Sequence, residues 1–175
     1  MTFFKSKKPN DILVIVFPGK EYTCDMPLLY YCTETALQSG CDVINLNYAS
    51  DDYKQIVNEV INENRYKNIV FASKSLGTIF AGETALQFPD SNITHFFLTP
   101  LAETIQYIGN FPVIIGDKDN FFASENIAYL PNVHVINGAD HSLEIAGDCI
   151  QSVEVLKLII GIWINVLEVC VNWNY

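Results

Sequence analysis

The chain has 175 residues, a length typical of one domain with one hydrophobic core, and we treat 1–175 as a single domain. Half of its residues are hydrophobic and 17% are charged, which predicts a folded globular protein and excludes intrinsic disorder. Because 20 acidic residues oppose 10 basic ones, the formal net charge of -10 argues against nucleic acid and anionic membranes as partners.

Short apolar runs alternate with helix-length segments along the chain. The expected strands are 12–17, 43–47, 68–72, 94–98, 113–116 and 133–136. The expected helices are 27–38, 51–64, 76–87, a short turn at 103–107, 124–130 and 152–173. Because the strand segments are continuously apolar, both of their faces should be covered. This order predicts an α/β fold, a three-layer α/β/α sandwich with a mainly parallel sheet of about six strands.

The apolar segment 155–173 raises the question of a membrane span. Lys157, Asn165 and Glu168 interrupt it, and charged and polar groups are costly at the centre of a bilayer. We therefore expect a long core helix and no membrane span. An apolar face left exposed on this helix would be the interface of a homodimer.

Cysteine usage indicates the redox environment. The five cysteines are odd in number and contain no C-x-x-C pair, so neither a zinc site nor a disulfide framework is expected. We expect reduced, mostly buried thiols, no metal, and a cytoplasmic protein, since the run 12–17 is too short for a signal peptide.

Several chemically reactive residues follow the expected strands, where ligands of parallel sheets bind. Ser75 follows the third strand, acidic residues follow the fifth, and His141 follows the sixth. A serine nucleophile needs a base to take its proton and a carboxylate to orient that base. Ser75 could instead be an ordinary helix N-cap, but that role leaves the later acid and histidine unexplained.

His141 is the best candidate for the base. His95 and His134 lie inside expected strands and are more consistent with core or flanking positions, whereas His141 lies in a loop beyond a strand end.

Several acidic residues are candidates for the partner of this histidine. Asp119 ranks first because its side chain can lie over the sheet, Asp117 ranks second, and Glu103 is the third choice. Asp140 is adjacent to His141 in sequence and reaches its imidazole poorly.

Three segments together resemble the α/β-hydrolase family. Residues 73–77 (SKSLG) match its G-x-S-x-G elbow, 116–119 (GDKD) its acid loop, and 138–141 (GADH) its histidine loop. Residues 17–20 (FPGK) resemble its oxyanion segment. The resemblance implies a serine hydrolase that needs no cofactor and cleaves a small ester-like substrate, a carboxylic ester or thioester, through an acyl-enzyme. The implied triad is Ser75, His141 and Asp119, with the backbone amides of Leu76 and Lys20 as oxyanion donors.

The chain departs from the family pattern in three respects. Ser73 stands where the elbow usually has glycine, no long insertion follows residue 98 to form a lid, and the two leading antiparallel strands are expected to be absent. The resemblance therefore implies a minimal, lidless hydrolase with an open site.

Residues near the expected rim are candidates for a substrate pocket or for helix packing: Tyr22, Met26, Leu101, Phe121 and Phe122. Lys74, next to the candidate nucleophile, is expected to be exposed to solvent or ion-paired. The alternative function is a non-catalytic binding or assembly protein on a hydrolase scaffold.

Overall fold

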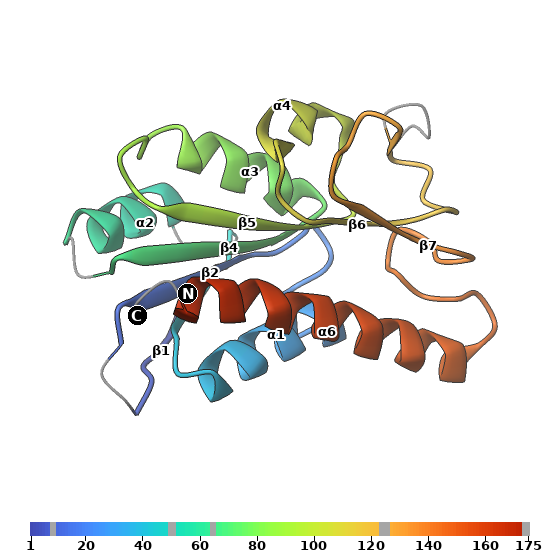
Figure 1. The fold of residues 1–175 in the computed structure, drawn as a ribbon, viewed down its shortest axis with the longest axis horizontal. Coiled ribbons are helices and arrows are strands. Elements are labelled where there is room, and N and C mark those ends of the chain that lie inside the picture. Colours follow the sequence, from blue (N-terminus) through green and yellow to red (C-terminus); the bar gives the residue numbers. More distant parts are fainter. Residues whose placement is uncertain (8–9, 49–51, 64–65, 123–126, 173–175) are drawn as a thin grey trace.

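The computed structural model describes residues 1–7, 10–48, 52–63, 66–122 and 127–172. For residues 171 and 172 it describes the backbone alone. Its centre is a seven-stranded sheet in the order β1-β3-β2-β4-β5-β6-β7 (Figure 1). The strands are β1 (Thr2–Phe4), β2 (Ile12–Phe17), β3 (Asp42–Asn45), β4 (Asn68–Lys74), β5 (Ile93–Leu98), β6 (Val113–Gly116) and β7 (Val133–Ile136). All neighbours are parallel except β1, which pairs antiparallel with β3.

Helices cover both faces of this sheet (Figure 1). One layer holds α1 (Pro27–Gln38) and α6 (Cys149–Asn172). The other layer holds α2 (Tyr53–Asn62), α3 (Leu76–Ala85) and, beyond the short 3-10 helix η1 (Ala102–Thr104), α4 (Ile105–Ile108). The predicted three-layer α/β/α architecture is confirmed.

The strand count differs from the prediction at the amino-terminal end. All six expected strands are present, but β1 forms a seventh, so the expectation that both leading antiparallel strands are missing was wrong for one strand. β1 has three residues with no fully buried side chain, and its sequence therefore carries no strong strand pattern. The predicted helix 124–130 falls partly on residues 123–126, which lie outside the described residues.

Alternate residues of β2 point into two different cores. Ile12, Val14 and Val16 belong to the cluster beneath α1 and α6, whereas Leu13, Ile15 and Phe17 belong to the cluster beneath α2 and α3. All six side chains are buried. The continuous apolar run in the sequence thus reflects a strand covered on both faces.

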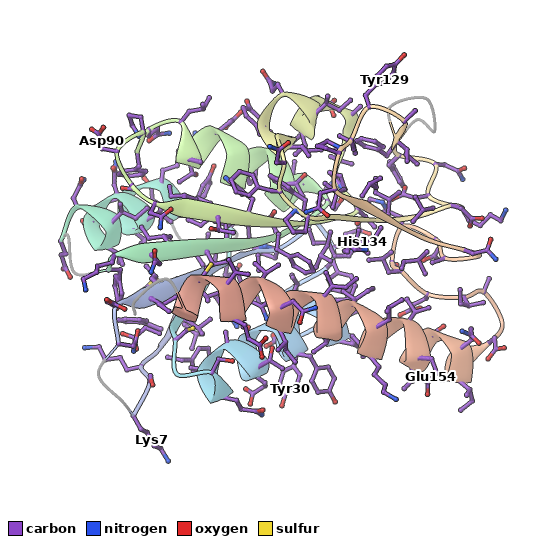
Figure 2. All side chains as sticks on the ribbon, in the orientation of Figure 1. Lys7, Tyr30, Asp90, Tyr129, His134 and Glu154 are labelled. Carbon is purple, nitrogen blue, oxygen red and sulfur yellow. The ribbon has the colours of Figure 1, made fainter. Side chains whose placement is uncertain are left out.

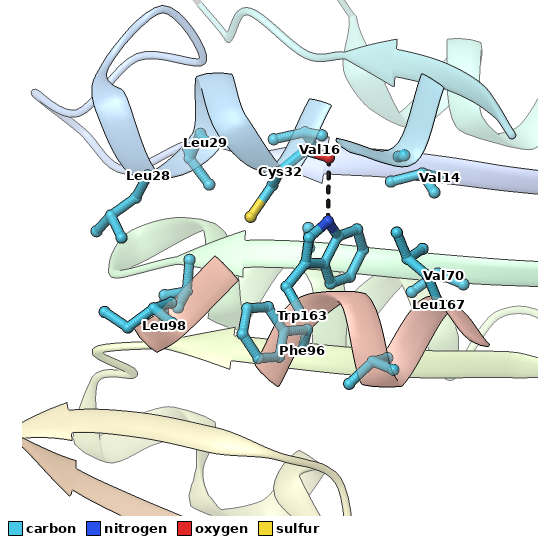
Figure 3. Close-up of a cluster of buried hydrophobic side chains, with 14 of the residues drawn as sticks. Val14, Val16, Leu28, Leu29, Cys32, Val70, Phe96, Leu98, Trp163 and Leu167 are labelled. Carbon is cyan, nitrogen blue, oxygen red and sulfur yellow. Dashed lines mark hydrogen bonds between the residues drawn. The ribbon is translucent and has the colours of Figure 1, made fainter. Parts of the chain in front are cut away.

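Trp163 anchors α6 against the sheet and α1 (Figure 3). Its side chain is fully buried, its ring lies 5.3 Å from that of Phe96, and its Nε1 donates a 3.1 Å hydrogen bond to the carbonyl oxygen of Cys32. Outward residues of the same layer, such as Tyr30 and Glu154, project away from the sheet (Figure 2). Helix α6 is therefore a core helix, as predicted for residues 152–173. Within the described part of the chain, none of the helices has the length and apolarity that a bilayer crossing requires.

Candidate active site

Ser75 lies in a sharp turn between β4 and α3. Its backbone has φ 52° and ψ -120°, a conformation that is unusual for a residue with a side chain. A Cβ on Gly77 would collide with the carbonyl oxygens of Phe17 and Pro18, so a glycine is required where α3 begins over the end of β2. The serine is thus held at the carboxyl end of the sheet by a strained turn with a close backbone approach.

Ser73 shows how the chain tolerates a residue other than glycine before the turn. Its side chain is fully buried, and its Oγ donates a 3.4 Å hydrogen bond to the carbonyl oxygen of Phe96. On the helix side, Thr78 Oγ1 donates to the carbonyl oxygen of Ser75 at 2.6 Å. The turn is therefore fixed from both sides by side-chain hydrogen bonds.

His141 contacts both the serine and an aspartate. Its Nε2 lies 2.8 Å from Ser75 Oγ, and its Nδ1 lies 2.8 Å from Asp119 Oδ2. The Asp119 side chain is completely buried, and its Oδ1 also accepts a 2.9 Å hydrogen bond from the amide of Phe121. The three predicted residues thus form one continuous chain of hydrogen bonds.

The other acidic candidates are engaged elsewhere. Asp117 Oδ1 accepts a 2.6 Å hydrogen bond from the amide of Gly138, and Asp140 Oδ1 accepts one of 2.7 Å from the amide of Ser142. Glu103 is exposed in η1. Asp117 and Asp140 therefore shape the histidine loop, and Asp119 alone among these acids contacts the imidazole of His141.

The loops that carry Asp119 and His141 pack directly against each other. The amide of Lys118 donates a 3.0 Å hydrogen bond to the carbonyl oxygen of Ala139. A Cβ on Gly116 would collide with the same carbonyl group. This close approach explains why β6 ends in glycine.

Two backbone amides near Ser75 are candidate oxyanion donors. The amide of Leu76 belongs to the first residue of α3, where helix geometry supplies no intrahelical acceptor. The amide of Lys20 donates to none of the described residues. Gly19, next to Lys20, lies close to the serine turn, since a Cβ at Gly19 would be 3.4 Å from Ser75 Cβ and 3.3 Å from Tyr22 Cβ.

Only part of the predicted pocket set borders open space. Tyr22 lines a cavity of about 570 Å³, together with apolar residues of α1, the segment that follows the histidine loop, and α6: Leu28, Leu143, Ile145, Val153 and Leu156. This cavity begins at Ser142, next to His141, and its described lining does not include Ser75 or His141. Phe121 is 63% exposed, and its ring centroid lies 4.5 Å from that of His141.

The remaining pocket candidates lie elsewhere. Phe122 is buried in the core cluster of Phe97 and Ile115, so it packs the fold and does not line this cavity. Met26 and Leu101 precede α1 and η1 and do not line it either. Residue type and loop position did not separate surface aromatics from core aromatics.

Lys74 contradicts its sequence-based expectation. It is 1% exposed and forms no ion pair with any described residue. Its Nζ instead donates hydrogen bonds of 2.7 Å to Thr99 Oγ1 and 2.7 Å to the carbonyl oxygen of His141. Burial lowers the pKa of Lys74 to about 8. Thr99 was not singled out from the sequence, although its position just after β5 was the available signal.

The other histidines and the cysteines lie away from this hydrogen-bonded chain. His95 is 4% exposed and packs among aromatic rings, as expected of a core residue, whereas His134 is half-buried on β7. Cys24, Cys32, Cys41 and Cys170 are buried free thiols, and Cys149 is exposed. Across the described ranges, no group of three His, Cys, Asp or Glu side chains is placed to hold a metal ion.

The fold of the chain is similar to that of several solved structures. A protein of unknown function from Agrobacterium tumefaciens, classed with the α/β hydrolases, superimposes with a TM-score of 0.74 over 98% of this chain and 90% of its own, at 14% sequence identity. The chain has the α/β-hydrolase fold. Est1E from Butyrivibrio proteoclasticus, solved with ferulic acid bound, gives 0.67 over 94% and 93% of the two chains at 13% identity. The esterase Pf2001 from Pyrococcus furiosus gives 0.61 over 87% and 80% at 16% identity.

Sequence comparisons add no assignment to this α/β-hydrolase fold. No family model and no curated protein matches the sequence. At these low identities, the structural likeness establishes the fold, and the chemistry has to be argued from the residues themselves.

Proposed function

We propose that the protein is a serine hydrolase that cleaves a small carboxylic ester or thioester through an acyl-enzyme. The observation that carries the proposal is the hydrogen-bonded chain from Ser75 through His141 to Asp119, with both contacts of His141 at 2.8 Å. A nucleophile, a base and an orienting acid in this arrangement perform acyl transfer on unrelated folds.

The proposed reaction has two steps. His141 Nε2 takes the proton of Ser75 Oγ as the oxygen attacks the substrate carbonyl, and the amides of Leu76 and Lys20 donate to the developing oxyanion. His141 then gives the proton to the leaving alcohol or thiol. In the second step His141 deprotonates water, which attacks the acyl carbonyl and breaks its bond to Ser75 Oγ, and His141 returns the proton to this oxygen. Asp119 keeps the imidazole in the required tautomer throughout.

The lining of the cavity beside the histidine loop favours a substrate with an uncharged, apolar group. Its lining combines Tyr22, Leu143 and Leu156 with the acidic residues Glu144 and Asp148, and no lysine or arginine is among the described residues that line it. Together with the net charge of -10, this lining disfavours anionic substrates. One of the similar structures, the Pyrococcus furiosus esterase Pf2001, is in keeping with ester cleavage.

Labelling with a fluorescent fluorophosphonate tests this proposal, because the reagent reacts with activated serines. We expect the wild type to be labelled, and Ser75→Ala and His141→Ala to lose the label while remaining folded by circular dichroism. Ser39→Ala, which changes an exposed serine after α1, is the matched control and should be labelled normally. Absence of labelling in the folded wild type would favour a binding or assembly role on the same scaffold.

The outer face of α6 supports a homodimer as the proposed assembly. Three of its apolar side chains that do not line the cavity are more than half exposed: Ile150, Leu158 and Val169. Exposed apolar residues grouped on one helix favour association. Multi-angle light scattering tests this proposal, and a strictly monomeric mass at high protein concentration would contradict it.

A further inference from the structure

Lys74 is a buried cation that contacts three separate segments around the proposed site. Its two 2.7 Å hydrogen bonds reach Thr99, just after β5, and the main chain of His141. Its Nζ also lies 4.8 Å from the centroid of the Tyr22 ring, in the segment after β2. An ammonium over an aromatic face is attracted by the ring electrons. The donors of this side chain are therefore directed at the segments that surround Ser75.

This position is unfavourable for a lysine. A buried ammonium without an ion pair loses its hydration, and none of the described carboxylates lies within ion-pair distance of Lys74. The more distant carboxylates of Asp119, Asp140 and Glu144 offset only part of this cost, since burial still lowers the pKa to about 8. A packing role would be filled better by an uncharged side chain of similar length, such as methionine.

Thr99, the hydrogen-bond acceptor of Lys74, is itself strained. Its φ is 42°, a value rarely adopted by a β-branched residue, and its amide is fixed by a 2.8 Å hydrogen bond to the carbonyl oxygen of Ile114. Strain of this kind persists where the surroundings impose it, and it concentrates at functional sites. In this conformation Thr99 directs its hydroxyl at the ammonium of Lys74.

Resting on the proposed function, we propose that Lys74 is a positioning residue whose ammonium fixes the main chain of His141 so that the imidazole reaches Ser75 and Asp119 together. Thr99 and Tyr22 hold the ammonium in place. The side chain acts through the histidine and does not contact the substrate.

This role makes turnover depend on the charge of Lys74. Loss of its proton weakens both hydrogen bonds and removes the attraction to the Tyr22 ring. We therefore expect kcat to fall as the pH rises through about 8, the pKa of Lys74. The other titratable groups facing the ammonium are Tyr22, whose pKa burial raises to about 12, and the carboxyl groups of Asp119, Asp140 and Glu144.

The same titration moves protein stability in the opposite direction. The folded pKa of Lys74, about 8, is lower than its ordinary value of 10.5, so the unfolded chain binds more protons between these two values. The contribution of this group to stability is therefore least favourable below pH 8 and becomes more favourable as the pH rises to 10.5. If kcat falls between pH 8 and pH 10.5, Lys74 contributes no loss of folding stability that could explain the fall. The fall then reflects the position of His141 and not unfolding.

Lys74→Met tests the proposal because it keeps the length of the side chain and removes the charge. We expect an unchanged or higher melting temperature, since a buried charge is removed. We expect kcat for p-nitrophenyl acetate at pH 7 to fall roughly 10- to 100-fold with KM nearly unchanged, and the fall in kcat near pH 8 to disappear. Lys157→Met, at a side chain that is 79% exposed, is the matched control and should retain the wild-type profile.

Two substitutions of Thr99 separate its hydroxyl from its shape. Thr99→Val removes the acceptor of Lys74 and keeps the branched side chain, so we expect it to lower kcat in the same direction as Lys74→Met. Thr99→Ser keeps the hydroxyl, and we expect kcat close to that of the wild type. Equal effects of the two substitutions would contradict a role through Lys74.

Hydrogen–deuterium exchange gives a readout that does not need hydrolysis. We expect Lys74→Met to raise exchange several-fold in residues 139–145 and to leave the strands of the sheet unchanged. Unchanged exchange in this segment, or a kcat equal to that of the wild type, overturns the proposal. If the wild type neither hydrolyses esters nor binds the fluorophosphonate, the proposed function fails, and exchange still decides whether Lys74 fixes the main chain of His141.

Discussion

Gly77 at the start of α3 lies directly against the carbonyl oxygen of Pro18, the residue after β2, with no room for a Cβ between them. Pro18 also leads into the segment of Lys20, one of the two proposed oxyanion donors. A single close contact thus sets the spacing between the serine turn and the segment that faces it.

Gly77→Ala is therefore expected to destabilise the protein and to impair labelling. Forcing a methyl group into this contact should cost about 1–3 kcal/mol in the free energy of unfolding, measured by urea denaturation. Gly161→Ala is the control, because Gly161 lies in the exposed middle of α6 with open space around it. That substitution should instead stabilise the protein by about 0.5–1 kcal/mol. Equal effects at both positions would argue against the tight turn.

Asp119→Asn should separate the orienting acid from its neighbours. The amide keeps the shape of the side chain but favours the wrong tautomer of His141, so we expect kcat to fall by about 10³- to 10⁴-fold with the fold retained. Asp117→Ala removes the acceptor of the Gly138 amide and should cost about 1 kcal/mol of stability while preserving most of the turnover. A larger loss of kcat in Asp117→Ala than in Asp119→Asn would reverse the assignment.

The order of elements and the serine, acid and histidine positions could be predicted from the sequence because each depends on local pattern. Continuous apolar runs mark strands covered on both faces, and the carboxyl ends of parallel strands converge on one edge of the sheet. The sequence favoured Asp119 but could not exclude Asp117, because the choice depends on which side chain turns toward His141 and which toward Gly138.

Features that depend on long-range packing could not be predicted. Strand β1 has only three residues and is stabilised by pairing with β3, far along the chain. The burial of Lys74 results from acceptors on two other segments, Thr99 and His141, which no local pattern reveals. Phe121 and Phe122 are adjacent and chemically identical, yet one covers His141 and the other packs the core.

Val153→Trp should restrict the proposed substrate cavity without disturbing the core. Val153 lines the cavity and is 54% exposed, so the larger side chain can fill open space from the helix surface. We expect KM to rise for p-nitrophenyl esters with longer acyl chains, with little change for the acetate ester. Leu86→Trp is the control, since Leu86 is 69% exposed at the end of α3 and does not line this cavity. Identical acyl-chain profiles in the two variants would exclude this cavity as the binding site.

His95 should make the fold sensitive to acid. Burial lowers the pKa of His95 from 6.5 to about 4, and its Nδ1 has no hydrogen-bond partner among the described residues. The unfolded chain therefore binds more protons between these two pH values. The contribution of neutral His95 to the free energy of unfolding is fully present above pH 6.5 and is lost as the pH falls to about 4. A shift of this size corresponds to about 3 kcal/mol. His95→Phe, which preserves the stacking on Phe97, should flatten this part of the stability profile in urea titrations from pH 7 to pH 4. If the free energy of unfolding of the wild type stays constant over this range, protonated His95 is accommodated in the folded protein and the prediction is wrong.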